Sequence, residues 1–580
     1  MILQALKQYY DRLAASDDDA IPRFGFARQK IHFCLLLDRQ GKLVEDLDLR
    51  KHEGKKPLPA EKIVPEPVKR TGDIAPNFLW DNTGYVLGVD GKGKPERTAR
   101  TFAAFKEFQH EIGDGLEDEG MKAVLLFLDG WKPEDAVDLH YREEMIGQNV
   151  VFRLDGEAGF VHDRPKVRDA WLRHYAADDE AVSGMCLVTG GDGPIARLHP
   201  AIKGVAGAQS SGAALVSFNL DAFKSYGKEQ NFNAPIGQEA TFAYTTALNW
   251  LLRGESRQKI LIGDATVVFW TERENPAEDL LSMLLNPDAS ESDGGDGAST
   301  QDLRVIMEAV REGRMQEAVR EPEVPFYILG LSPNASRLSV RFWFVSTVGN
   351  ILKNVEKHFG QMSLRKSFPN EPDYPAVWRL LRETAAQGKR ENVSPLLAGA
   401  LMKAVLTGSA YPMNLLPSIL TRIRADHAIN YLRAGLIKAC LIRNHNHTEV
   451  GVSLDKENAN IGYRLGRLFA VLERVQTSAN PGISSTIRDK YYGSASATPR
   501  NVFPMLISLA QQHLGKLRRD AEKKRRGGFY DSRVEEIVAA LPAGALPAFL
   551  DPENQGLFAL GYYHQRQDLF AGKSEREEED

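Results

Sequence analysis

The side chains best suited to binding another molecule lie between Pro194 and Leu252, in two polar segments rich in amides, hydroxyls and lysines. Asn, Gln and Lys donate hydrogen bonds both to base edges and to phosphates, so these segments fit a surface that contacts nucleic acid. Glycines in the first segment would let the backbone approach a ligand closely, although loops of this composition often only turn the chain. The first segment contains Lys203, Gly204, Gly207, Gln209, Ser210, Ser211 and Gly212, and the second contains Asn219, Ser225, Tyr226, Lys228, Gln230, Asn231 and Asn233.

The elements expected to position these segments are a short strand, Ala214 to Phe218, between them and a helix that ends at Leu252. Neither segment contains the phosphate-binding pattern GxxxxGK[ST], and the glycines do not follow a strand in a GxGxxG frame. Nucleotide binding of those two kinds is therefore disfavoured.

No arrangement of catalytic residues is evident, because HExxH, GxSxG and acidic pairs with metal-site spacing are all missing from the sequence. His445 and His447 form an HxH pair, which fits a solvent loop better than a metal site without further ligands. His199 lies beside the glycine-rich segment and could contact a phosphate, but a lone histidine is more often structural. We therefore predict a non-catalytic protein with no metal and no cofactor.

A second candidate binding surface lies in the C-terminal part. Helix 461–474 is expected to bury an apolar stripe and to place Arg464, Arg467 and Arg474 on the opposite side. Further on, seven basic residues lie between positions 516 and 526. This cluster fits either a solvated helix end, where the helix dipole favours cations, or a patch that follows a phosphate backbone.

Composition indicates an ordinary globular protein, with 43% hydrophobic and 26% charged residues among 580. This length predicts about three or four domains. The net charge of −5 does not indicate nucleic-acid binding by itself, because a global sum hides local clusters. Three distant cysteines fit a reducing compartment, and no apolar run approaches the ~20 residues that span a bilayer. We expect a soluble cytoplasmic protein.

The predicted fold class is α+β, an irregular mixed α/β N-terminal part followed by an all-helical C-terminal bundle. Short strands such as 122–128, 149–154 and 264–270 occur without a regular βαβ rhythm, and the pattern becomes wholly helical from about residue 347. The expected domains are 1–285, α+β; 286–300, an acidic linker; 301–346, a helix with a β-hairpin; and 347–580, a helical bundle.

Several long segments resemble one family, the Csd-type large subunit of type I-C CRISPR Cascade. They extend from the N-terminus to beyond residue 500, so the resemblance covers nearly the whole chain. The segments are MILQALKQYYDRLA, PVKRTGDIAPNFLWDNTGYVLG, PIARLHPAIKGVAGAQSSGAALVSFN, AFKSYGKEQNFNAPIGQEATFAYTTALN, GYRLGRLFAVLERVQ and YYGSASATPRNVFP.

The resemblance implies a role in antiviral defence. Such a subunit recognises the protospacer-adjacent motif on duplex DNA, initiates unwinding, holds the displaced single strand and helps to recruit a helicase-nuclease. Sequence recognition of the target is left to base pairing with the guide RNA. The implied partners are therefore the guide RNA, the target duplex DNA and its displaced strand, the backbone, RNA-processing and small subunits of Cascade, and the helicase-nuclease, with no membrane.

The resemblance also suggests roles for matched residues. Donors to the minor groove would be Asn77, Asn82, Lys203, Gly207, Gln209, Ser210 and Ser211. A strand-separating wedge at a loop tip would consist of Gln230, Asn231 and Phe232. Phosphates would be held by Lys69, Arg70, Lys92, Lys94, Lys228, Arg464, Arg467, Arg474, Lys516, Arg518, Arg519, Lys523, Lys524, Arg525 and Arg526.

A further implication is that about residues 452–580 resemble a small subunit translated separately, starting at Val450 or Val452. Two alternatives to motif recognition stay open. One is a structural clamp for the end of the guide RNA that makes no direct DNA contact, and the other is a divergent metal-dependent nuclease.

Overall fold

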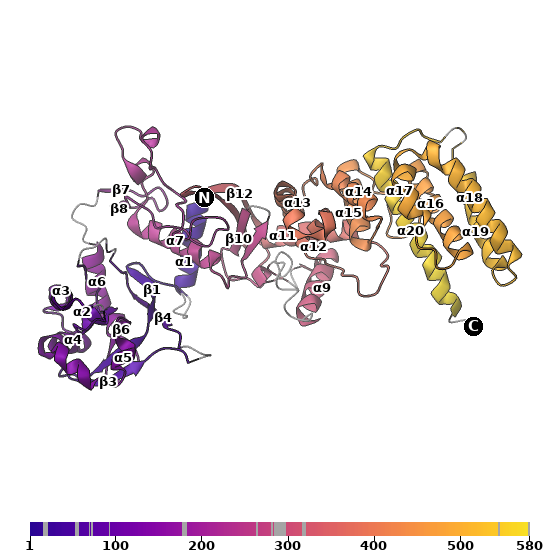
Figure 1. Ribbon diagram of the computed structural model, residues 1–580. Helices are drawn as coiled ribbons and strands as arrows, with labels where there is room; N and C mark the ends of the chain where they lie inside the picture. The colour runs from indigo at the N-terminus through magenta and orange to yellow at the C-terminus, as the bar shows by residue number, and fades with distance from the viewer. Residues whose placement is uncertain are drawn as a thin grey trace. The chain divides into compact units, whose positions relative to one another are not determined.

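The computed structural model describes residues 1–577 apart from 16–20, 53–56, 69, 71–73, 92, 177–181, 263–264, 280–281, 283–296, 316–318, 320, 543 and 545. The described chain forms two compact units (Figure 1). The first comprises Met1–Ile202 and Ala214–Trp250, and the second comprises Lys203–Ala213 and Leu251–Asp580.

A four-stranded mixed sheet, in the order β3-β2-β6-β5, forms the centre of the first unit. Strand β2, with the sequence FCLLL, is buried at every position, as expected for a continuous apolar run with partners on both sides. It pairs antiparallel with β3 and parallel with β6, and β5 closes the other edge. The strands are β2 (Phe33–Leu37), β3 (Leu43–Asp48), β5 (Trp80–Asn82) and β6 (Asn149–Leu154).

Helices cover this sheet, and a separate two-stranded sheet joins β1 to β4. The apolar run 122–128, predicted as a strand, lies in helix α4, so that prediction is wrong. The Asp118 side chain caps this helix by accepting a hydrogen bond from the Met121 backbone N–H at 3.0 Å, which fixes the start of the helix. The elements are α1 (Ile2–Ala15), β1 (Phe26–Ile31), β4 (Ala60–Pro65), α2 (Thr83–Val86), α3 (Pro95–Gly113), α4 (Glu119–Gly130), α6 (Pro165–Ala176), β7 (Ser183–Met185), β8 (Asp192–Pro194) and α7 (Gln238–Leu252).

The second unit begins with an antiparallel sheet in the order β12-β11-β10-β9. We expected the strand at 264–270 in the N-terminal domain, but β10 pairs with β11 along its length and therefore belongs to this sheet. Helix α9 begins at Gly297, so the last residues of the expected linker 286–300 are helical, and 286–296 lie outside the described residues. The elements are β9 (Lys259–Ile262), β10 (Ala265–Thr271), α9 (Gly297–Arg311), β11 (Pro325–Asn334) and β12 (Arg337–Thr347).

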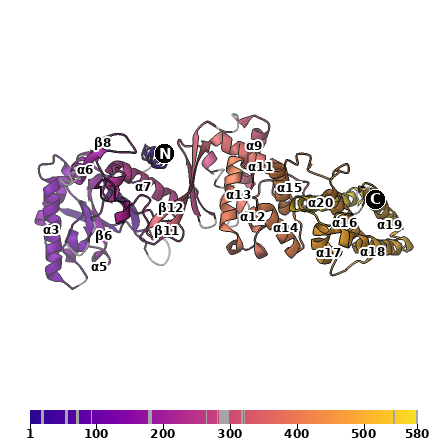
Figure 2. The same cartoon turned by 90° about the horizontal axis from the view of Figure 1, so that it is seen from above.

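Helices occupy the rest of the second unit, and one continuous apolar core extends from the sheet into them. Helix α20 lies between α15 and α16 in both views (Figures 1 and 2). The helices are α11 (Val348–Met362), α12 (Val377–Arg382), α13 (Pro395–Thr407), α14 (Leu415–Asp426), α15 (Tyr431–His445), α16 (Ile461–Ala479), α17 (Ile487–Ala497), α18 (Pro499–Arg519), α19 (Lys524–Ala539) and α20 (Pro552–Glu577). The α+β fold class, with mixed elements first and helices last, is confirmed.

Helices α16 and α20 approach each other at glycines. A Cβ atom on Gly466 would overlap the Phe558 carbonyl oxygen, and one on Gly561 would overlap the Tyr463 carbonyl oxygen. Because each glycine faces the backbone of the other helix, the two helices pack more closely than larger residues would allow.

Candidate nucleic-acid interface

The first polar segment, Lys203–Ala213, is an irregular loop of the second unit. It is fixed to the sheet where the Ala206 N–H donates to the Thr266 Oγ1 at 2.9 Å. Gly204, Gly207 and Gly212 adopt positive φ values of 86°, 76° and 94°, which glycine reaches without strain. Within this loop Lys203, Gly207, Gln209, Ser210 and Ser211 are exposed.

The expected strand between Ala214 and Phe218 is not formed. Only isolated bridges at Ala213 and Ala214 occur in that segment. A short apolar run becomes a strand only where a neighbour supplies ladder hydrogen bonds, and the sequence does not reveal that neighbour. The segment instead passes from the second unit to the first, so the two polar segments belong to different units.

The second polar segment has its tip at Tyr226 and Gly227, not at the residues predicted as a wedge. The Lys228 N–H donates to the Ser225 carbonyl at 2.9 Å, and both central residues have positive φ, 51° at Tyr226 and 70° at Gly227. This is the pattern of a type I′ turn, in which Asn or Gly is usual at the first central position. The Tyr226 side chain is nevertheless 99% exposed.

The predicted wedge residues form the short 3-10 helix η4 (Gln230–Asn233) at the base of this loop. Asn231 is only 2% exposed, and the Gln230 side-chain oxygen accepts from Arg197 Nη1 at 3.3 Å. The Asn233 side-chain amide donates to the backbone carbonyls of Lys228 and Gln230. The prediction that Gln230, Asn231 and Phe232 lie at a loop tip is therefore wrong.

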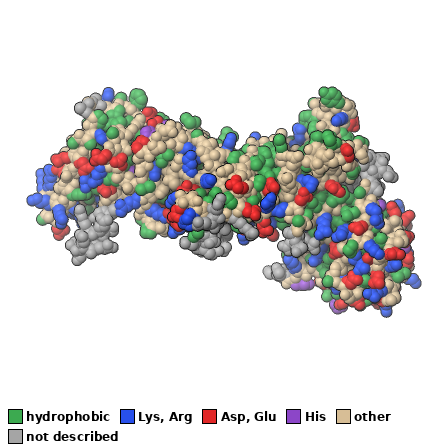
Figure 3. Space-filling view, turned by 180° about the vertical axis from the view of Figure 1, so that it is seen from behind, with side chains coloured by type: hydrophobic (Ala, Val, Ile, Leu, Met, Phe, Trp, Pro, Cys, Tyr) green, Lys and Arg blue, Asp and Glu red, His purple; other side chains and the backbone are tan. Residues whose placement is uncertain are grey.

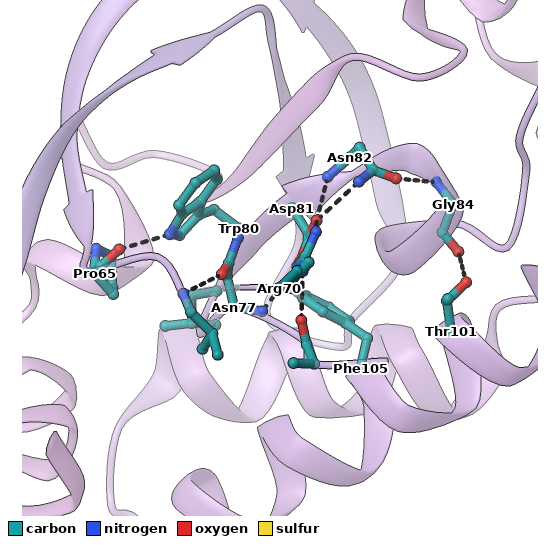
Figure 4. A network of polar contacts seen from close by, with 12 residues as sticks. Pro65, Arg70, Asn77, Trp80, Asp81, Asn82, Gly84, Thr101 and Phe105 are labelled. Atoms are coloured by element: carbon teal, nitrogen blue, oxygen red, sulfur yellow. Dashed lines mark hydrogen bonds and ion pairs between the residues drawn. The ribbon is translucent and has the colours of Figure 1, made fainter. Parts of the chain in front are cut away.

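Asn77 and Asn82 are part of a local hydrogen-bond network with Arg70 and Asp81 (Figure 4). Asn77 is 4% exposed, and its side-chain oxygen accepts from the Val68 N–H at 3.0 Å. Asn82 caps α2 by accepting from the Gly84 N–H at 3.1 Å, while its Nδ2 donates to Asp81 Oδ1 at 3.1 Å. Asn77 is buried, and the Asn82 amide N–H₂ already donates to Asp81, so neither side chain is placed as a donor to DNA.

Arg70 belongs to the same network. Its Nη1 donates to Asp81 Oδ1 at 3.1 Å, its Nη2 pairs with Oδ2, and its guanidinium lies 4.1 Å from the centre of the Tyr85 ring. Burial raises the pKa of the Asp81 carboxyl, and the bonds from Arg70 oppose that shift. Arg70 therefore neutralises a buried carboxylate. Of the other phosphate candidates in this unit, Lys94 and Lys228 are exposed, whereas Lys69 and Lys92 lie outside the described residues.

The three arginines of α16 do not form a solvent-facing row. Arg467 is 2% exposed, and it donates to the Lys456 carbonyl at 3.0 Å and to the Gln565 side chain at 3.1 Å. Arg464 donates to the Asn458 carbonyl at 2.7 Å, and Arg474 lies 5.0 Å from the Phe570 ring centre. Helices α17 to α20 surround α16, so its polar face packs against protein, and the predicted orientation is wrong.

The basic cluster at 516–526 spans the end of α18 and the start of α19, and Lys and Arg side chains gather at this end of the helices (Figure 3). Three members have partners: Lys516 with Asn480, Arg518 with Asp531 and Lys523 with Asp520. Four exposed members, Arg519, Lys524, Arg525 and Arg526, form no ion pair with any residue that the structure describes.

The helix dipole accounts for only part of this cluster. It favours Lys516, Arg518 and Arg519 in the last turn of α18, but Lys524, Arg525 and Arg526 lie in the first turn of α19, where cations are disfavoured. The dipole therefore does not account for the three cations at the start of α19.

The histidines considered earlier have partners within the protein. His199 Nδ1 lies 2.6 Å from the Tyr244 hydroxyl, and burial lowers the pKa of His199 to about 4. His445 and His447 both contact Glu553. Over the described ranges, no group of three or more His, Cys, Asp and Glu side chains is placed to hold a metal ion.

Residues 6–570 match the family model of a CRISPR-associated protein (Cas_Csd1). The chain belongs to this CRISPR-associated family. The match confirms the resemblance to the Csd-type large subunit of type I-C Cascade. No curated protein matches the chain. None of the helices in the described part of this Csd1 family member is long and apolar enough to cross a membrane.

Proposed function

We propose that this Cascade large subunit recognises the protospacer-adjacent motif on duplex DNA through the loop Lys203–Ala213. The observation that carries the proposal is the exposure of Gln209, Ser210 and Ser211 on a backbone bent by glycines. In the minor groove A·T pairs present only acceptors, so an amide N–H₂, hydroxyls and a lysine are suitable partners. Glycines allow the backbone to approach the groove floor. Asn77 and Asn82 are not among the proposed donors, because Asn77 is buried and the Asn82 amide N–H₂ donates to Asp81.

The test is binding of the assembled complex to duplexes with a correct or a scrambled motif. Gln209→Ala removes one base contact, so it should reduce the preference for the correct motif by ~1–3 kcal/mol. Gln40→Ala, at an exposed glutamine in the β2–β3 turn, is the matched control and should retain the preference. Equal loss on both duplexes for Gln209→Ala would count against recognition of bases by this loop.

For strand separation, Tyr226 replaces the three residues predicted earlier. Tyrosine is unfavourable at a turn position with positive φ, and Tyr226 is fully exposed, so this side chain does not stabilise the turn. An aromatic ring can stack on a base that has lost its pairing partner. Tyr226→Asn should relax the turn yet weaken opening of the duplex beside the motif by ~1–3 kcal/mol, the value of one base–aromatic stack. Fluorescence of 2-aminopurine beside the motif measures this opening. If the Tyr226→Asn variant opens the duplex to the same extent as the wild-type protein, the tyrosine ring is excluded as a wedge.

The displaced strand would lie along the α18–α19 cluster, whose exposed arginines and lysines suit a phosphate backbone. Guide RNA, the other Cascade subunits and the helicase-nuclease remain proposed partners, and we propose that the subunit itself is not catalytic. The clamp alternative predicts that the complex binds duplexes equally with or without the motif. The nuclease alternative predicts metal-dependent DNA cleavage by the isolated protein.

We also propose that residues from about 452 are made as a separate small subunit. Intact-mass analysis of protein expressed from the unmodified gene should then show a second product of 129 residues if it starts at Val452 and ends at residue 580. A single full-length species would remove this part of the proposal.

A further inference from the structure

The first unit contains a pocket of ≈ 600 Å³ that no proposed role above uses. It lies where the β1–β4 sheet meets the segment leading into α6. Four cationic side chains reach it from different elements: Arg23 before β1, Arg28 on β1, Lys62 on β4 and Arg168 on α6. The volume is within the range of about 300–1,000 Å³ that is usual for small-molecule sites.

The charge of the lining favours an anion. Two carboxylates, Glu61 and Asp163, accompany the four cations, and Arg28 Nη1 lies 3.7 Å from Glu61 Oε2. The Arg168 guanidinium has no ion-pair or hydrogen-bond partner among the residues that the structure describes. His162, which also lines the pocket, adds no charge, since burial lowers the pKa of its imidazole.

The rest of the lining is apolar and aromatic. Ile21, Phe26 and Ile63 contribute aliphatic and ring surface, and half-buried Phe160 stacks on His162 with ring centres 5.4 Å apart. A phosphate ion alone would leave this apolar surface uncovered, whereas a nucleotide would cover it with the base or sugar attached to its phosphate. Cations beside apolar and aromatic walls are the combination that binds a nucleotide.

We propose that this pocket binds one nucleotide, with its phosphate held by Arg168 and Lys62 and its base against the apolar wall. The source is either a free nucleoside monophosphate or the phosphorylated end of a single strand. This site is separate from motif recognition, because neither the Lys203–Ala213 loop nor Tyr226 lines the pocket.

The experiment uses the full chain alone, without guide RNA or duplex, and measures binding of AMP and of a 5′-phosphorylated hexauridine by calorimetry. AMP binding would indicate a free nucleotide. Binding of only the hexauridine would indicate a strand end in the pocket if Arg168→Gln weakens it, because the α18–α19 cluster is itself proposed to bind a single strand. Arg168→Gln and Lys62→Gln should each weaken binding at least about tenfold, as loss of a charge-assisted contact does. Arg173→Gln is the matched control, since Arg173 is exposed on the same helix and does not line the pocket.

Three results would overturn the proposal: no binding of either ligand, equal weakening by Arg168→Gln and Arg173→Gln, or competition by inorganic phosphate as strong as that by AMP. An acidic peptide that binds where AMP does not would also overturn it. Failure of motif discrimination in the assembled complex would leave this measurement unchanged, so the two proposals can fail separately.

Discussion

The guanidinium of Arg70 pairs with both carboxylate oxygens of Asp81 and lies 4.1 Å from the centre of the Tyr85 ring. Asp81 is only 1% exposed, and it also accepts hydrogen bonds from the backbone N–H groups of Asn77 and Asn82. The ion pair therefore joins Arg70 to a buried carboxylate that the backbone of residues 77 and 82 also contacts.

Replacing Arg70 should destabilise the first unit. Arg70→Ala leaves the Asp81 carboxylate buried without its partner, which costs about 3–5 kcal/mol. Arg70→Lys should recover little of the lost free energy of unfolding, because an ammonium group cannot form the two paired bonds to Asp81 or stack on the Tyr85 ring as a guanidinium does. Urea unfolding measures the loss, and Lys94→Ala, at an exposed lysine, is the control. A loss as small as that of Lys94→Ala would show that the pair contributes little.

A methyl group at the α16–α20 contact should be far more costly than one elsewhere in the helices. Gly466→Ala places Cβ against the Phe558 carbonyl, and the two helices must move apart at a cost of about 1–3 kcal/mol or more. Gly515→Ala in α18 is the matched control, since its Cβ would meet no atom within 4 Å. There the higher helix propensity of alanine should stabilise the protein by about 0.5–1 kcal/mol. Opposite shifts in the thermal unfolding midpoint would confirm the contact, and equal shifts would contradict it.

The stability of the second unit should depend on pH through His447. Burial alone would lower the pKa of this imidazole, but its hydrogen bonds to Glu449 and Glu553 raise the pKa above the ordinary value. A raised folded-state pKa means that protonation stabilises the fold. The contribution is complete below the unfolded pKa of about 6.5 and is lost as pH rises through the folded value.

His447→Gln should flatten this dependence. Unfolding free energies measured from about pH 6 to 8 would then change less for the variant than for the wild type. Identical pH profiles would show that the contacts with Glu553 and Glu449 do not carry the effect.

The α18–α19 cluster should govern how salt affects single-strand binding. Neutralising Lys524, Arg525 and Arg526 together removes up to three phosphate contacts, so the slope of log K against log salt should fall by about 2. Fluorescence anisotropy with a labelled single strand measures the slope. Lys403→Gln, at an exposed lysine on α13, should leave it unchanged. A slope that is the same for the triple variant and the wild type would exclude the cluster from strand binding.

The general fold was predictable where patterns were long. The β2–β3 hairpin and the C-terminal helices follow from apolar runs and periodicity. The apolar run of α4 was ambiguous between strand and helix, although the capping residue Asp118 marked the helix start. The pairing of β10 with β11 depends on a partner strand more than 50 residues away in sequence, which a local pattern cannot reveal.

The candidate site was predictable only by residue type. Amides were expected to face DNA, but the surroundings of Asn77 and Asn231 bury them, and no local pattern gives that burial. Arg467 was placed on a polar face that other helices cover. In the sequence Tyr226 is one polar residue among several, and its place in the turn depends on a backbone conformation that the local pattern does not give. The Tyr-Gly pair between two lysines was the available signal, because glycine at that place favours a tight turn.

Two faces of helix α20 pack against other helices. Gly556 packs near Ile437, Leu416 and Leu441, side chains of α15 and α14, while Gly561 meets the backbone of α16. A polypeptide starting at Val452 would keep the second neighbour and lack the first. The apolar face of α20 that contacts α14 and α15 would then be exposed to solvent, so the shorter product would need to bury it against another molecule. The face of α20 that packs against α14 and α15 in the full chain would thus be an intermolecular binding surface in the shorter product.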